Sequence, residues 1–325
     1  MQLPTASDLR AALAAGPPLL LDGAMGSQLL ASGFDLARDY LEVEDGVEVL
    51  NLTRPEQVRA VHESWFDAGC DLATTNTFMA LPSVLTECGQ GARLNEIVAA
   101  AVREARAAAE AWSDEDRPRW VLGGAGPGTD LPTKSGRSRA AVEADYDALL
   151  RRLTSGRVDG LLIETCADPI QIAAAVAAAR RIGDEPLLLS LLPGAAPLAE
   201  AVAAARDHGV DLLALNCGDG PGGMEAGLAQ LRELWDGPLG CWPNAGATGP
   251  EEPAGIGPIG PEDFAAGVAE LARRFDLRLV GGCCGTSPAH LRALARRLGR
   301  PDSDGFYAEL ESEDELDDEP ADDDE

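Results

Sequence analysis

Three cysteines of this sequence each stand at the end of an apolar run. Cys217 ends the segment DLLALNC, and Cys283 and Cys284 end LRLVGGCC. If both segments are neighbouring strands of one parallel sheet, the three thiols converge at the carboxyl edge of that sheet, where parallel-sheet enzymes carry out their chemistry. Three thiolates at one point form an open zinc site that leaves one coordination position for a substrate. The pattern therefore predicts a metal centre at Cys217, Cys283 and Cys284.

The alternative interpretation is that cysteines serve as small buried apolar residues. It suits the other four of the seven cysteines in the chain, which are Cys70, Cys88, Cys166 and Cys241. The adjacent pair is different, because neighbouring residues on a strand point to opposite faces. Cys283 and Cys284 reach one point only if the backbone bends, and Gly281, Gly282 and Gly285 provide that freedom. A redox pair is disfavoured, because a disulfide between adjacent cysteines closes a strained ring.

An exogenous thiol that coordinates such a zinc ion loses its proton and stays nucleophilic, which favours alkyl transfer to a thiol. Asp22 and Glu164 each end an apolar run, and a buried carboxylate is costly unless it is paired. The ammonium group of an amino acid would pair them. The turn at Gly23, Ala24 and Met25 presents backbone N–H groups that suit a carboxylate. Thiol, ammonium and carboxylate together describe a thiol amino acid as substrate.

Other kinds of site are disfavoured by what the sequence lacks. The three histidines, His62, His208 and His290, fall in predicted helices rather than at strand ends. A histidine-ligated metal or a histidine-based catalytic triad is therefore not expected. The single lysine, Lys134, falls in a predicted loop, so a Schiff-base mechanism is not expected either.

The elements that must position these residues repeat a simple alternation. A short apolar run is followed by a turn and then by a helical stretch, and this unit occurs eight times. The runs are 18–23, 71–78, 119–126, 159–165, 186–193, 211–217, 239–246 and 277–285. The helices expected between them are 55–68, 94–112, 140–153, 169–181, 198–208, 224–234, 261–275 and 288–298. Eight strand–helix units in about 300 residues predict a single α/β domain, a (β/α)₈ TIM barrel over residues 1–300.

The charge of the chain is strongly negative, at −29, and acidic residues dominate the last segment. Residues 301–325 combine low apolar content with one sign of charge, which predicts a disordered acidic tail. A chain this acidic would repel nucleic acid and anionic membranes. The sequence holds no apolar run long enough to span a membrane and no secretory signal at its start, so we expect a cytoplasmic protein with reduced thiols.

Taken in order, several motifs resemble those of the zinc-dependent homocysteine S-methyltransferases. The motifs are LDGAMGSQL, NLTRPEQV, AGCDLATTNTF, GPGTDLPT, GLLIET, LNCGDGP, WPNAG and VGGCCGTSP, and they extend from about residue 18 to 298. The likeness is greatest to the homocysteine-binding module of cobalamin-dependent methionine synthase. The paired NC and GGCCG motifs are highly specific.

The resemblance implies a role for each matched position. Cys217, Cys283 and Cys284 would bind zinc, and Asn244 would occupy the fourth zinc position when substrate is absent. Asp22 and Glu164 would hold the amino group of homocysteine, and the backbone of Gly23, Ala24 and Met25 would meet its carboxylate. Thr75 and Asn76 would support the site.

The implied activity is methyl transfer to the thiol of homocysteine, giving methionine. The methyl donor stays open between a small molecule and a methyl-corrinoid protein acting in trans, because no cobalamin or folate module follows residue 300. The alternative function is a non-catalytic zinc-thiolate barrel that docks a corrinoid partner. The carboxylates of Asp22 and Glu164 speak against it, because a subunit that only holds metal needs no group for an amino acid.

Overall fold

Eight parallel strands form the centre of the molecule. We describe residues 6–44, 46–114, 117–246 and 258–300 of a computed structural model. The strands are β1 (Leu19–Leu20), β2 (Leu72–Thr74), β3 (Trp120–Ala125), β4 (Gly160–Cys166), β5 (Leu187–Leu191), β6 (Leu212–Cys217), β7 (Leu239–Pro243) and β8 (Leu277–Val280). They form one sheet in the order β1-β8-β7-β6-β5-β4-β3-β2, and a bridge between Leu21 and Leu72 joins its two edges. The predicted TIM barrel is confirmed.

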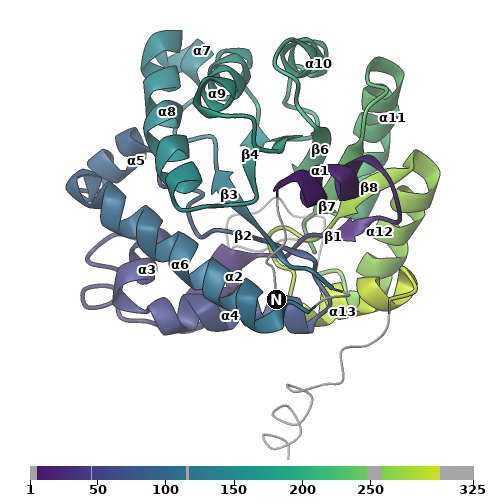
Figure 1. Cartoon of the computed structure of the whole chain (residues 1–325), viewed down its shortest axis with the longest axis horizontal. Helices are drawn as coiled ribbons and strands as arrows, with labels where there is room; N and C mark the ends of the chain where they lie inside the picture. Colours follow the sequence, from purple (N-terminus) through teal and green to yellow (C-terminus); the bar gives the residue numbers. More distant parts are fainter. Residues whose placement is uncertain (1–5, 45, 115–116, 247–257, 301–325) are drawn as a thin grey trace, which may run out of the picture.

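The helices that connect the strands surround the sheet (Figure 1). The eight predicted ones are α4 (Pro55–Asp67), α6 (Leu94–Trp112), α8 (Arg139–Ser155), α9 (Pro169–Ile182), α10 (Leu198–Asp207), α11 (Glu225–Leu234), α12 (Pro261–Phe275) and α13 (Pro288–Arg297). Proline begins several of them, at a position where the missing N–H would be unpaired anyway. Five further short helices are α1 (Ala6–Ala14), α2 (Met25–Ala31), α3 (Leu50–Thr53), α5 (Pro82–Glu87) and α7 (Pro132–Ser135). These were not predicted.

Apolar side chains pack in two layers. The larger layer lies between the strands and the surrounding helices. The smaller one combines inward-facing strand residues with two leucines from α1: Leu9, Leu13, Leu21, Leu72, Trp120, Leu122, Leu162, Leu188, Leu212, Ala214, Trp242 and Leu279. Strands covered on both faces read as continuous apolar runs, which is why the sequence showed them so clearly.

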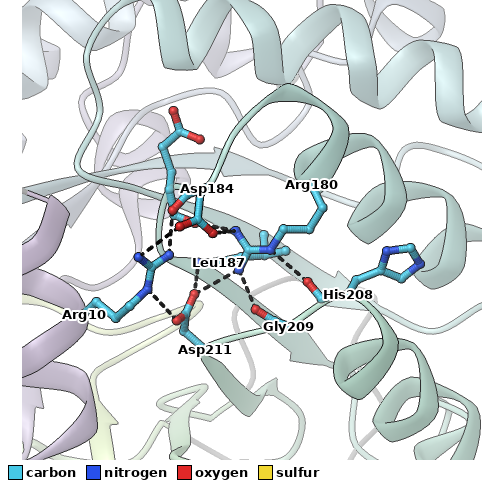
Figure 2. A network of polar contacts seen from close by, with 8 residues as sticks. Arg10, Arg180, Asp184, Leu187, His208, Gly209 and Asp211 are labelled. Atoms are coloured by element: carbon cyan, nitrogen blue, oxygen red, sulfur yellow. Dashed lines mark hydrogen bonds and ion pairs between the residues drawn. The ribbon is translucent and has the colours of Figure 1, made fainter.

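Helix α1 closes the end of the barrel where the strands begin. Its residues Leu9 and Leu13 are fully buried against the interior layer. Arg10, on the same helix, donates from Nε to Asp211 at 2.8 Å and from its guanidinium to the Asp184 carbonyl. Figure 2 shows the Arg10 and Arg180 guanidinium groups converging on the Asp211 carboxylate. Helix α1 and these ion pairs therefore cover the end of the barrel at which the strands begin.

The predicted disordered tail and the predicted absence of a membrane-spanning segment both involve residues that the structure does not describe. The acidic tail, residues 301–325, lies outside the described residues, as does the segment 247–257 that follows β7. Among the described residues, no helix is both long and apolar enough to cross a membrane.

Candidate metal centre and substrate cavity

The three predicted cysteines come together at the carboxyl end of the barrel. Their sulfur atoms all lie within 4.8 Å of one another, and Cys217 Sγ is 3.0 Å from Cys283 Sγ. The prediction that the two strands are neighbours is wrong, because β7 lies between β6 and β8. Cys217 pairs with Pro243 at the end of β7, and the Cys283 N–H donates to the Pro243 carbonyl at 2.9 Å. The thiols thus converge across the end of the intervening strand.

The backbone at this edge is bent by residues that are not glycine. Cys217 has a φ of 63° and Thr165 a φ of 60°, in the left-handed region that costs energy for such residues. Asn216 connects them, because its Nδ2 donates to Thr165 Oγ1 at 2.8 Å and to Cys217 Sγ at 3.4 Å. Ser190 Oγ in turn donates to Asn216 Oδ1 at 2.9 Å. Asn216 belongs to the NC motif, but its contact with the Cys217 thiol was not predicted from the sequence.

The three glycines beside the cysteine pair were expected to let the backbone bend, but they do not all act in this way. Only Gly285, with a φ of 75°, uses a conformation that other residues avoid. Gly281 instead permits close packing, because a Cβ atom there would lie 2.9 Å from Leu21 Cβ and 3.0 Å from the Asp22 carbonyl oxygen. The segment after β8 therefore packs closely against the end of β1.

The donor set fits a soft metal ion. Hydrogen bonds from the Cys217 and Cys283 thiols lower the pKa of Cys284, whereas the pKa values of Cys217 and Cys283 are raised, so the cluster favours a single thiolate. Asn244 lies next to it, and its N–H donates to the Cys217 carbonyl at 3.0 Å. Its side-chain oxygen, Oδ1, is buried and has no hydrogen-bond partner in the described part of the chain. Three sulfur ligands match a thiolate metal site that leaves one coordination position for another ligand.

Two carboxyl groups at the carboxyl ends of strands β1 and β4 have no cationic partner among the described residues. Asp22 is buried and accepts from the Thr74 N–H at 2.7 Å, and burial raises its pKa well above the usual value, with Glu164 adding to the rise. Glu164 accepts from Trp242 Nε1 at 2.9 Å, and the surrounding protein raises its pKa to about 7. No ion pair to either forms among the described residues. Both are thus poised to receive a positively charged group.

The predicted turn after β1 is the start of helix α2, which begins at Met25. The Ala24 N–H donates to Thr286 Oγ1 at 3.2 Å, so that amide already has an acceptor. The N–H groups of the first helical turn have no acceptor within the helix. Gly23, Ala24 and Met25 all line the cavity described next.

A cavity of about 260 Å³ is lined by Glu164 and the three thiols, whereas Asp22 is not among its lining residues. Its size lies near the lower limit for ligand pockets, which suits small substrates. It is lined by Gly23, Ala24, Met25, Gly26, Ser27, Leu30, Val47, Glu48, Thr74, Thr75, Asn76, Phe78, Met79, Gly124, Glu164, Thr165, Cys217, Gly282, Cys283 and Cys284. No lysine, arginine or histidine is among these described residues. Glu48, an acidic residue between two valines, was not predicted as a site residue from the sequence.

Comparisons with known proteins agree with this geometry. The model of the family described as homocysteine S-methyltransferase matches residues 19–298. The chain belongs to the homocysteine S-methyltransferase family. This membership favours methyl transfer over the alternative of a non-catalytic zinc-thiolate subunit.

Individual relatives show how far the likeness extends. The chain is 35% identical over 306 residues to the methionine synthase of Mycobacterium tuberculosis (strain ATCC 25618 / H37Rv), covering 88% of this chain and 25% of that protein. It is 34% identical to the methionine synthase of Mycobacterium leprae (strain TN), covering 86% of this chain and 24% of that protein. The chain therefore spans about a quarter of the length of these two relatives.

A solved structure of similar length is also related. It is the homocysteine methyltransferase MmuM from Escherichia coli in its metallated form, with 26% identity and a TM-score of 0.72. The match covers 89% of this chain and 99% of MmuM. A barrel of this size in the family has thus been seen with metal.

Proposed function

We propose that this chain is a zinc-dependent methyltransferase that moves a methyl group onto the thiol of homocysteine and so forms methionine. The observation that carries the proposal is the convergence of three thiols, within 4.8 Å, in the wall of a cavity that also presents Glu164. Family membership and the metallated state of MmuM support the same function.

Cys217, Cys283 and Cys284 would hold the zinc ion, with Asn244 as a fourth ligand when substrate is absent. Zinc bound there would lower the pKa of the substrate thiol, so that the sulfur is a thiolate and a nucleophile at neutral pH. The Asn216 amide would donate to the Cys217 sulfur and keep that ligand oriented.

Asp22 and Glu164 would bind the ammonium group of homocysteine. An incoming ammonium favours the charged form of both carboxyls and offsets the cost of burying them. Thr74 and Trp242 would hold the two carboxylates in place through the hydrogen bonds described above. The backbone of Gly23, Ala24 and Met25 would meet the substrate carboxylate, with the free amides of the first turn of α2 as donors.

The test is the metal content of the purified, reduced chain, followed by methyl transfer to homocysteine with a panel of donors. We expect one zinc ion per chain and formation of methionine. Asp22→Asn and Glu164→Gln should keep the zinc and raise the KM for homocysteine about 10- to 100-fold, because each removes one charged partner of the ammonium. A chain without zinc, or variants with an unchanged KM for homocysteine, would contradict the proposal. The cytoplasmic location stays a prediction.

A further inference from the structure

One carboxyl group in the cavity has no role in the function proposed above. Glu48 lies on a short 3₁₀ helix, Val47–Val49, and only 2% of its surface is exposed. Its Oε1 accepts from the Met79 N–H at 2.7 Å, and its own backbone N–H is the other donor to the carboxyl among the described residues. No ion pair to it forms in the described ranges. A carboxylate buried in this way is costly unless it meets a positive charge.

Glu48 stands apart from the pair that would hold the homocysteine ammonium. Glu164 is close enough to Asp22 to raise its pKa, whereas burial is the main cause that raises the pKa of Glu48, and neither of the other carboxyls contributes. One ammonium group is already matched by Asp22 and Glu164. Glu48 is therefore left for a second cation.

The surroundings of Glu48 are apolar and suit methyl groups. The cavity wall near it comprises Val47, Phe78 and Met79, and helix α2 contributes Met25 and Leu30. An aromatic face and thioether sulfurs interact favourably with a cation that carries methyl groups. A carboxylate set in such a wall matches a small onium ion better than a neutral ligand.

The segment that carries Glu48 is held rigidly. Asn76 Nδ2 donates to the Val47 carbonyl at 2.8 Å and to Asn51 Oδ1 at 3.1 Å, and Asn51 Nδ2 returns a bond to the Asn76 carbonyl at 2.8 Å. All three residues are buried. Glu48 is thus placed in the cavity wall by a closed set of buried hydrogen bonds, as a specificity determinant must be.

We propose that Glu48 determines the choice of methyl donor, by binding the positive charge of a small sulfonium or quaternary ammonium donor. This inference rests on the proposed function. In the transfer, the homocysteine thiolate attacks the methyl carbon, a new sulfur–carbon bond forms, and the bond from that carbon to the onium atom breaks. The electron pair of the broken bond stays on the leaving sulfur or nitrogen, which becomes neutral. The attraction to Glu48 is greatest before transfer and vanishes afterwards, so it lowers the donor KM rather than raising kcat.

The test compares initial rates of the full chain loaded with zinc, using S-methylmethionine, glycine betaine and methylcobalamin as donors. Glu48→Gln keeps an acceptor for the Met79 N–H and removes the charge. We expect it to raise the KM for the onium donor about 10- to 100-fold, the range for loss of a charge-assisted contact. The kcat, the KM for homocysteine and the zinc content should stay unchanged. Glu56→Gln, the same change at an exposed site on α4, is the matched control.

Two outcomes would overturn the inference. One is that Glu48→Gln has the same KM for the donor as the wild type while Glu48→Ala has a higher one. That result would show that Glu48 serves only to accept the hydrogen bond from the Met79 N–H. The other is turnover confined to methylcobalamin and insensitive to Glu48→Gln, which would leave the proposed function intact. Calorimetry of S-methylmethionine binding tests the inference even without turnover. Binding to the wild type that is lost in Glu48→Gln supports it, and absence of binding to the wild type overturns it.

Discussion

Acidic side chains lie at both ends of the barrel, but they meet different partners. At the amino end, Asp71, Asp159 and Asp211 directly precede β2, β4 and β6, and each forms ion pairs with arginine. At the carboxyl end, the three carboxyl groups described above have no ion-pair partner among the described residues, and their pKa values are raised. The protein neutralises negative charge where it needs stability and leaves it unpaired where a ligand can bind.

The amino end also shows a regular backbone pattern. Each of its three aspartates accepts the N–H of the strand before it, which ties neighbouring strands together where they begin. The bonds run from Leu20 to Asp71 at 2.8 Å, from Val121 to Asp159 at 2.7 Å and from Leu187 to Asp211 at 2.8 Å. These carboxylates therefore use their acceptor capacity within the fold, which is not true of Glu48.

The largest effect is expected at the carboxyl end. Cys284→Ser removes one of three sulfur ligands, and we expect loss of zinc and a fall of more than about 100-fold in kcat/KM, because even outer-shell changes at metal sites cost 10- to 100-fold. Metal analysis and methionine formation measure this. Cys88→Ser, at an exposed cysteine, is the control and should behave as the wild type. Full activity in Cys284→Ser would remove the metal centre from the mechanism.

The next effect is a loss of stability at the amino end. Asp211→Ala leaves Arg10, Arg180 and the Leu187 N–H without their shared acceptor. The expected loss is about 2–4 kcal/mol in the free energy of unfolding, measured by urea denaturation. Asp184→Ala is the matched control, because that carboxylate is 91% exposed and its ion pairs contribute about 0.5 kcal/mol or less. Zinc content should not change in either variant, and a loss of zinc in Asp211→Ala would break the division between the two ends.

Glu48→Gln should increase stability while weakening donor binding. Because the pKa of Glu48 is raised to about 7 in the folded protein, its contribution to stability is full below pH 4.5 and is lost as the pH rises through 7. At pH 8 the free energy of unfolding of the variant should be about 1–3 kcal/mol higher than that of the wild type. This difference should be smaller at pH 5. Glu164 and the three thiols, which also line the cavity, and the buried Asp22 are present in both proteins. A less stable variant would indicate a structural role.

The smallest effect concerns a buried group that follows neither pattern. His62, on α4, is fully buried, and neither ring nitrogen has a hydrogen-bond partner in the described part of the chain. Burial lowers its pKa to about 3, so its contribution to stability is full above pH 6.5 and is lost as the pH falls towards 3. The free energy of unfolding of His62→Leu, taken relative to that of the wild type, should therefore be about 1–2 kcal/mol higher at pH 5 than at pH 8. If the free energy of unfolding of His62→Leu depends on pH as that of the wild type does, the loss of stability in acid arises from titratable groups other than His62.

Much of the fold was predictable because its determinants are local. The eight strands read as apolar runs, and the eight connecting helices were predicted to within two residues at each end. Helix α1 was missed because it is short and lies before the first strand, and only its packing against the barrel interior explains it. Helix α2 was taken for a turn because glycines stand at its start. Glu48 was missed because its face is set by Asn51 and Asn76, not by its neighbours in sequence.

The sequence by itself determined the residue types of the site and the ends of the strands that carry them. The hydrophobic periodicity and the ends of the strands depend on a few neighbouring residues, so they can be predicted without knowing the contacts between distant segments. The tertiary structure alone decided that Cys217 meets Cys283 across β7, that Thr165 and Cys217 adopt left-handed backbone, and that Glu48 faces the cavity. Each of these features depends on packing between segments far apart in the chain. The local sequence does not determine which side of a segment such packing buries.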